Sequence, residues 1–271
     1  METIAVIHLG HSHLAAMVPY LWGRELENTN SNRVEHYVFD TSAHNIFAVD
    51  ESRFAYGVNC GEGITLNPEI ISMVERRIAP DRRVVYVSLF GGNSHNVLTL
   101  LQPARKFDFV VPWMPELPLR EDYELIPHAA IREALLANTS IFLDDLRGLR
   151  NSVDQQVMHV ISPPPIGNDE YLKTVVANDP YFSALGSENV TPAVIRYKSW
   201  AMHTKLYSDL CEEIGVDVIM PPPEATIDGK WLAPDCYGAD PTHGNVHYGG
   251  LILRAIEQKL EGHFAGWDWL R

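Results

Sequence analysis

Short apolar runs rich in β-branched residues alternate with longer helical patterns along the whole chain. Turn-forming residues flank each of the five runs, which cover residues 4–9, 34–39, 84–90, 157–161 and 216–220. The helical patterns cover residues 14–26, 68–78, 128–149, 192–214 and 246–260. Because strands joined by helices pair in parallel with right-handed crossovers, this alternation predicts an α/β fold. We expect a three-layer α/β/α architecture with a five-stranded parallel, flavodoxin-like sheet in the order 2-1-3-4-5.

The continuous alternation favours one domain over residues 1–271, although this length could also hold two small domains. Two connections, around residues 103–127 and 163–190, are unusually long. Residues 107–111 within the first fit either an edge strand or part of the connection. Both connections carry aromatic residues, so they either wall a substrate cleft or cover a sheet edge.

Charge and composition limit the partners. The chain has 21 Lys and Arg against 35 Asp and Glu, a formal net charge of −14, so its surface repels nucleic acid and anionic membranes. No run approaches the roughly 18 apolar residues of a membrane span, and the first run is too short for a signal peptide. The three cysteines lack the CxxC spacing of zinc clusters and are too few for a disulfide framework. We therefore expect a cytoplasmic protein.

Polar residues suited to chemistry follow three of the predicted strands. They are the segments GHSH at residues 10–13, GGNSH at 91–95 and DPTHGN at 240–245. Because parallel strands end at the same edge of a sheet, these segments should meet at one rim, where ligands of such sheets bind. A serine in a glycine turn that opens a helix presents its hydroxyl to this crevice, beside backbone N–H groups that can bind negative charge.

A nucleophilic triad can be assembled from these segments. Ser12 needs a base, and His243 can supply one if Asp240, three residues earlier in a non-helical turn, fixes its tautomer. Asn93 offers an uncharged N–H donor for the oxyanion of a tetrahedral intermediate, and its neighbouring glycines would allow close substrate approach. Each residue alone has an ordinary structural explanation, as a helix cap or a turn residue. Their conjunction on one rim favours a catalytic site.

The order of these segments resembles the SGNH, or GDSL-like, hydrolase superfamily. Residues 10–12 resemble its first sequence block with His11 in place of the usual Asp, and residues 91–94 resemble its third with Ser94 in place of Asp. Residues 240–243 fit its last block. The resemblance implies a serine esterase that needs no metal or organic cofactor.

By this resemblance Ser12 is the nucleophile, His243 the base and then the acid, and Asp240 the residue that orients it. The oxyanion hole would consist of the Ser12 backbone N–H, the Asn93 side chain and a glycine N–H after the second strand. Gly61 and Gly63 are both candidates for that glycine, and we select Gly63.

The expected substrate is a small-molecule or carbohydrate ester. The acidic surface and the aromatic connections suggest a neutral or cationic substrate with a short acyl group, such as an acetylated sugar. The superfamily that the chain resembles also includes lipases, thioesterases and acyltransferases, so the class of ester stays open.

Two other hypotheses remain. A set of rim side chains could instead ligate one or two metals in a phosphoesterase: His11, His13, His95, His243, His247, Asp240 and Asn93. Residues 10–13 resemble the Gly-His-x-His element of calcineurin-like metallophosphoesterases, although here that element comes first rather than late in the chain. The third hypothesis is a non-catalytic binding module. No Gly-x-Gly-x-x-Gly or Walker element supports a nucleotide cofactor.

Overall fold

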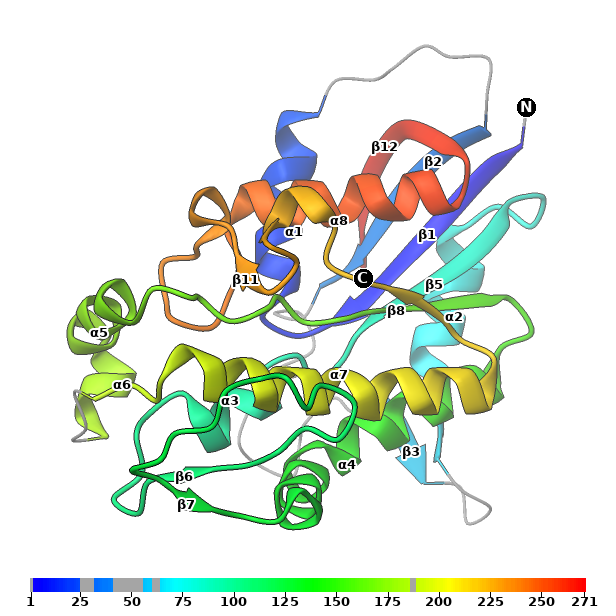
Figure 1. Cartoon of the computed structure of the whole chain (residues 1–271). Coiled ribbons are helices and arrows are strands. Elements are labelled where there is room, and N and C mark those ends of the chain that lie inside the picture. The colour runs from blue at the N-terminus through cyan, green and yellow to red at the C-terminus, as the bar shows by residue number, and fades with distance from the viewer. Residues whose placement is uncertain (1, 25–31, 41–55, 60–63, 186–188) are drawn as a thin grey trace.

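A computed structural model of the chain describes residues 2–24, 32–40, 56–59, 64–185 and 189–271. Its centre is a parallel sheet of six strands in the order β12-β2-β1-β5-β8-β9 (Figure 1). These strands are β1 (Thr3–Gly10), β2 (Asn32–Phe39), β5 (Arg83–Leu89), β8 (Gln156–Val160), β9 (Asp217–Ile219) and β12 (Gly262–Leu270). The predicted α/β class and the order of the five predicted strands are confirmed.

The predicted count of five strands is wrong, because β12 extends the sheet beyond β2. Its sequence, GHFAGWDWL, contains two glycines and an aspartate, so it lacks the continuous apolar run by which the other strands were recognised. The register against β2 shifts between Phe264 and Gly266, and Gly266 adopts a φ of 154°. Such a bulge suits an edge strand.

Helices cover both faces of the sheet. One layer contains α1 (Leu14–Gly23) and α8 (Val246–Lys259), and the other contains α2 (Pro68–Arg77), α4 (His128–Ser152) and α7 (Ala193–Ile214). Residues of β1 alternate between the two cores, with Ile4 and Val6 on the α1 side and Ala5 and Ile7 on the other. A strand buried on both faces reads as a continuous apolar run, which is why sequence patterning located it.

Asparagine side chains cap the N-termini of two of these helices. The Asn67 side chain accepts a hydrogen bond from the backbone N–H of Glu69, and Asn245 accepts one from that of Tyr248. These bonds satisfy N–H groups that the first turn of a helix leaves without partners. Asn245 thereby fixes where α8 begins, directly after the segment that carries Asp240 and His243.

The smaller elements lie in the connections. They are β3 (Gly57–Asn59), β4 (Ile64–Leu66), α3 (Ser94–Thr99), β6 (Phe107–Asp108), β7 (Glu124–Leu125), α5 (Asp169–Asn178), α6 (Pro180–Ala184), β10 (Thr226–Ile227), β11 (Trp231–Leu232) and two 3₁₀ turns, Pro223–Ala225 and Pro234–Cys236. Residues 107–111 therefore do not add an edge strand to the main sheet. Instead, β6 pairs with β7 in a separate two-stranded ribbon.

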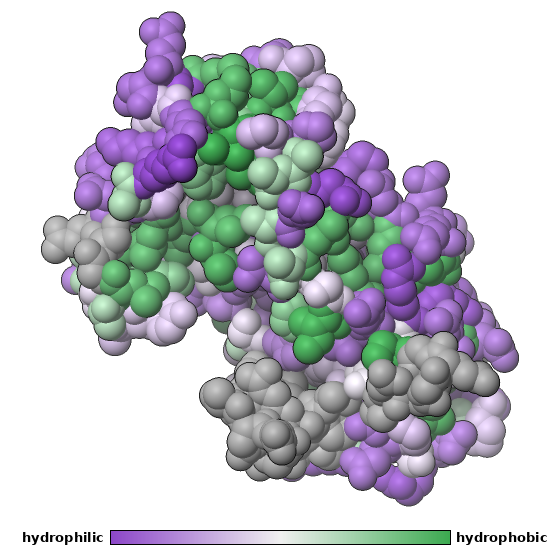
Figure 2. Space-filling model, turned by 90° about the horizontal axis from the view of Figure 1, so that it is seen from below, coloured by the Kyte–Doolittle hydropathy of each residue, from purple (hydrophilic) through white to green (hydrophobic). Residues whose placement is uncertain are grey.

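The surface of the molecule carries both apolar and hydrophilic side chains. On the face shown in Figure 2, apolar side chains lie among hydrophilic ones, which predominate along the outline of the molecule. Within the described part of the chain, no helix combines the length and apolar character that crossing a membrane would require.

Candidate active site

The three polar segments predicted to share a rim do meet there. Ser12 lies between the end of β1 and the start of α1, and its Oγ is 2.6 Å from Nε2 of His243, which lies just before α8. The two residues are 231 positions apart in the sequence. Their contact is therefore a product of the sheet topology, which brings the ends of distant strands together.

Ser12 occupies a turn that opens a helix. The backbone N–H of Leu14 donates to the carbonyl of His11, and that of Ala15 donates to the carbonyl of Ser12. Ser12 directly precedes His13, the N-cap residue of α1, so it lies at the helix end whose dipole favours negative charge. The Ser12 side chain is exposed, so a substrate can reach it.

Asp240 contacts the Nδ1 side of the His243 ring. The Nδ1 atom of His243 lies 2.9 and 2.8 Å from the two carboxylate oxygens of Asp240. The backbone N–H and the hydroxyl of Thr242 each donate to the same carboxylate at 2.8 Å. Burial opposes the charge, but the hydrogen bonds from His243 and Thr242 outweigh it and hold the pKa of Asp240 well below its usual range. The ionised carboxylate favours a proton on Nδ1, so Nε2 is left to accept the Ser12 proton.

Asn93 lies beside the Ser12–His243 pair, as predicted. Its Nδ2 atom is 3.0 Å from His243 Nε2 and 3.3 Å from the Thr242 hydroxyl. In this arrangement the Asn93 amide therefore contacts the His243 ring. Sequence reasoning placed the residue correctly but could not foresee this partner.

The two glycines before Asn93 were predicted to allow close substrate approach, and the structure gives another reason for them. Gly91 adopts a φ of 68°, a conformation that favours glycine, and a Cβ there would overlap the Tyr207 hydroxyl. A Cβ on Gly92 would overlap the ring of His13. Both glycines are thus required by packing against protein side chains.

The remaining oxyanion candidates, Gly61 and Gly63, lie outside the described residues. Ser94 has a structural role, because its hydroxyl donates to the carbonyl of Gly91 at 3.2 Å. Tyr56 was missed by sequence reasoning. Its hydroxyl hydrogen-bonds to the peptide groups of Gly10, two residues before Ser12. No sequence pattern marks such a residue, because its role depends on a tertiary contact.

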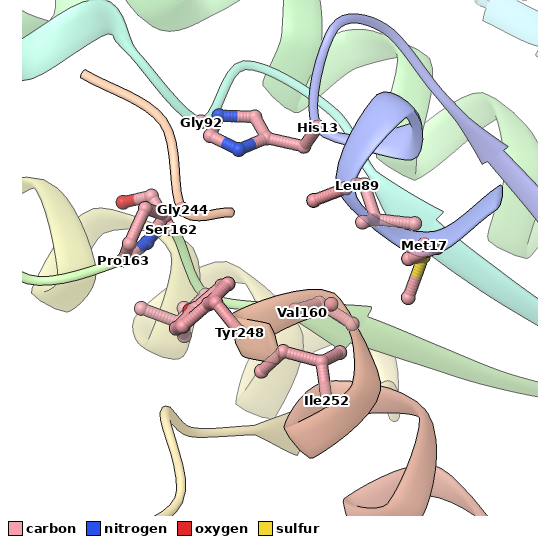
Figure 3. Close-up of a pocket in the computed structure, with 13 residues that line it drawn as sticks. His13, Met17, Leu89, Gly92, Val160, Ser162, Pro163, Gly244, Tyr248 and Ile252 are labelled. Atoms are coloured by element: carbon pink, nitrogen blue, oxygen red, sulfur yellow. The ribbon is translucent and has the colours of Figure 1, made fainter. Parts of the chain in front are cut away.

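A cleft of about 390 Å³ opens beside Ser12 and Asn93. Leu89, Val97 and Phe142 form apolar parts of its lining, and Ser12 and Asn93 lie in its polar part. The long connections were expected to wall the cleft or cover an edge, and the residues that line it come from other segments. A second, smaller pocket lies behind His13, lined mainly by apolar residues such as Met17, Val160 and Ile252 (Figure 3).

The described residues do not assemble the ligand set of the metal hypothesis. In this part of the chain, Asp235, Cys236 and His247 are the group of three potential ligands whose donor atoms lie within 4.8 Å of one another. His95 instead lies in the interior beside His203, with ring centroids 5.1 Å apart. Burial and the neighbouring His203 lower the pKa of His95 well below its usual value, so it is a neutral core residue.

Comparison with known proteins gives distant structural likenesses. No protein-family model matches the sequence, and no curated protein sequence matches it. A GDSL-like lipase from Bacteroides thetaiotaomicron is 11% identical, with a TM-score of 0.37 over 96% of this chain and 88% of that one. A carbohydrate acetylesterase from Sinorhizobium meliloti is 13% identical, with a TM-score of 0.36 over 95% and 98% of the two chains. Sequence identities and TM-scores this low do not identify a function, so the evidence for function lies in the residues of this chain.

Proposed function

We propose that the protein is a serine hydrolase that cleaves carboxylic esters through an acyl-enzyme on Ser12. The main support for this proposal is a chain of two contacts. Ser12 Oγ contacts His243 Nε2, and His243 Nδ1 contacts the Asp240 carboxylate. This geometry has the features of a nucleophile activated by a base that a third group orients.

The reaction has two halves. His243 Nε2 removes the Ser12 proton while Oγ attacks the carbonyl carbon of the ester, and the Asp240 carboxylate stabilises the resulting imidazolium. The tetrahedral intermediate collapses, the bond to the alcohol oxygen breaks, and His243 returns the proton to that oxygen. Water then repeats the attack on the acyl-enzyme with His243 as base, which releases the acid and restores Ser12.

Donors around Ser12 would stabilise the oxyanion. We assign this role to the Ser12 backbone N–H, the Asn93 amide and the backbone N–H of Gly63. The contact of Asn93 with His243 breaks naturally during attack, because a protonated Nε2 becomes a donor and can no longer accept a hydrogen bond.

The proposed substrate is a small ester with a short acyl group, such as an acetylated carbohydrate. A cleft of about 390 Å³ with an apolar wall at Val97 and Phe142 suits a small substrate. The net charge of −14 disfavours anionic esters and favours neutral or cationic ones.

A fluorophosphonate probe tests the nucleophile directly. The wild-type protein should become labelled on Ser12, identified by peptide mass spectrometry, and should hydrolyse p-nitrophenyl acetate. Ser12→Ala should lose both properties, whereas Ser183→Ala, which alters an exposed serine of α6, should keep both. An unlabelled wild-type protein without esterase activity would favour the binding-module hypothesis. Activity that EDTA abolishes and Zn²⁺ restores would favour the metal hypothesis.

A further inference from the structure

Two buried polar atoms next to the triad have no hydrogen-bond partner in the described part of the chain: Nε2 of His13 and Oδ1 of Asn93. Both atoms are shielded from solvent, so bulk water cannot satisfy them. A buried polar atom left without a partner destabilises the folded state, and folded proteins rarely leave two such atoms in one place. The two atoms therefore call for a common explanation.

The two side chains are neighbours. The Nε2 atom of His13 lies directly over Gly92, the residue before Asn93, at the edge of the small pocket in Figure 3. The His13 ring also lies against His243, with ring centroids 4.8 Å apart. His13 is thus packed between the loop that carries Asn93 and the catalytic base.

The protonation state of His13 suits a donor to an amide oxygen. Burial, with the nearby His243, lowers its pKa to about 3, so the ring is neutral near pH 7 and carries one N–H. The Asn93 side chain acts in the opposite direction and raises this pKa. A rise in pKa is expected when a hydrogen-bond acceptor faces an imidazole N–H, because the acceptor stabilises the protonated ring.

We propose that His13 is a positioning residue: the two unpartnered atoms pair after a small rotation of either side chain, so that Nε2–H of His13 donates to Oδ1 of Asn93 and fixes the orientation of the Asn93 amide. With Oδ1 held by His13, Nδ2 must point toward His243 Nε2, the contact seen at 3.0 Å. The opposite amide orientation would place Nδ2 against the His13 N–H, donor against donor. His13 therefore selects one of the two orientations that an asparagine can adopt.

The catalytic consequence rests on the serine-hydrolase function proposed above. When His243 takes the Ser12 proton, Nε2 becomes a donor and releases the Asn93 amide N–H. Because His13 still holds the oxygen end, the freed N–H stays on the side of Ser12, where the oxyanion forms. Without His13 the amide can turn its oxygen toward the developing negative charge, which would destabilise the transition state.

The tautomer of His13 is the first test, and it needs no catalytic activity. Nitrogen chemical shifts of the wild-type protein, assigned with the His13→Gln variant, should report His13 as the neutral Nε2–H form near pH 7. A proton on Nδ1 instead, or a protonated ring at pH 6, overturns the proposal. This result is independent of whether Ser12 is a nucleophile, which fluorophosphonate labelling of the wild-type protein decides.

The second test is kinetic. His13→Phe keeps a planar ring but removes the donor, and it should lower kcat for p-nitrophenyl acetate about 10-fold or more with KM nearly unchanged. This loss should stay below the ~100- to 1,000-fold cost of losing an oxyanion donor outright. His13→Gln, which retains an N–H donor, should recover part of the rate, and the exposed control His128→Phe should have no effect.

A double-mutant cycle separates this role from a general structural one. Because His13 acts through Asn93, His13→Phe should add little to the loss already caused by Asn93→Ala. Circular dichroism and thermal unfolding establish that each variant is folded before its kinetics are compared. Full kcat in His13→Phe, or losses that simply multiply in the double variant, would contradict the assignment.

Discussion

The Tyr56 hydroxyl hydrogen-bonds both backbone groups of Gly10, accepting from the N–H at 3.0 Å and donating to the carbonyl. Gly10 ends β1, and Ser12 follows two residues later. A Cβ on Gly10 would lie 2.8 Å from the Cβ of Leu89, so the end of β1 also packs tightly against β5. The turn that carries Ser12 is therefore held from two sides, by a neighbouring strand and by one buried tyrosine.

Tyr56→Phe should loosen this turn. Removal of the hydroxyl leaves the buried Gly10 N–H without its partner, which costs about 1–3 kcal/mol of unfolding free energy. Misplacement of Ser12 should also lower kcat. Urea denaturation and esterase assays measure the two effects. Tyr86→Phe, which alters a buried tyrosine of β5, is the control for kcat. Equal kcat values in the two variants would show that Tyr56 does not position Ser12.

Asp240→Asn should leave the fold intact and nearly abolish activity. The amide cannot hold a proton on His243 Nδ1 as the carboxylate does, so the ring adopts the tautomer that cannot accept from Ser12. The loss near neutral pH should reach up to roughly 10,000-fold in kcat. Retained fluorophosphonate labelling at the wild-type rate would contradict this assignment.

The Asp240 carboxylate should make the free energy of unfolding depend on pH. Hydrogen bonds hold the pKa of Asp240 below its usual range in the folded protein, whereas the unfolded chain has the ordinary value of about 3.9. The stabilisation is thus complete above about pH 4 and is lost as the pH falls further. Between pH 6 and pH 3 the wild-type protein should lose more unfolding free energy than Asp240→Asn. Equal losses in urea titrations would mean that Asp240 is not stabilised as a carboxylate.

Sequence patterns predicted most of the sheet because buried parallel strands read as apolar runs, as in residues 4–9. They missed β12 because an edge strand tolerates Gly266 and Asp268. The position of the candidate site was also predictable from the sequence. Strand order alone brings Ser12 and His243 to one rim, so topology predicts their proximity.

The contacts around the triad could not be predicted in this way. Tyr56 contacts Gly10, and His13 packs over Gly92. Each contact joins two segments that are far apart in the sequence. A single tyrosine or histidine has no periodicity from which its partner could be read. The contact between Asn93 and His243 likewise depends on side-chain rotamers rather than on topology.

Asn93→Ala should lower kcat about 100- to 1,000-fold with little change in KM, because the amide stabilises charge that exists only after attack. Asn138→Ala is a suitable control, since Asn138 also lines the cleft but hydrogen-bonds to its own helix at Ala134. Steady-state kinetics on p-nitrophenyl acetate separate the two constants. A raised KM with unchanged kcat would make Asn93 a substrate clamp.

A buried ion pair anchors the connection around residues 103–127. Lys198 of α7 contacts Asp108 at 2.7 Å, and both side chains are 1% exposed. Lys198→Met should cost about 3–5 kcal/mol of unfolding free energy, because it leaves the Asp108 carboxylate buried with two backbone N–H donors but without its cationic partner. Lys205→Met, on the same helix but in an exposed pair with Asp209, should cost about 1 kcal/mol or less. Urea denaturation measures the unfolding free energy of both variants. Similar losses in the two would contradict a structural role for the Lys198–Asp108 pair.

The apolar wall of the cleft should set the preference for acyl length. Phe142 lines the cleft beside Ser12, whereas its neighbour Ile141 on α4 is exposed and does not line it. For wild-type protein, kcat/KM should therefore fall along the series of p-nitrophenyl esters from acetyl to decanoyl. Phe142→Ala removes the phenyl ring and should shift the optimum toward longer chains, because the enlarged cleft can bury more methylene groups at about 0.8 kcal/mol each. Ile141→Ala is the matched control and should keep the wild-type order. Wild-type rates that rise steadily toward decanoyl would refute the short-acyl preference while leaving the triad intact, and an unchanged order in Phe142→Ala would show that another wall limits the acyl chain.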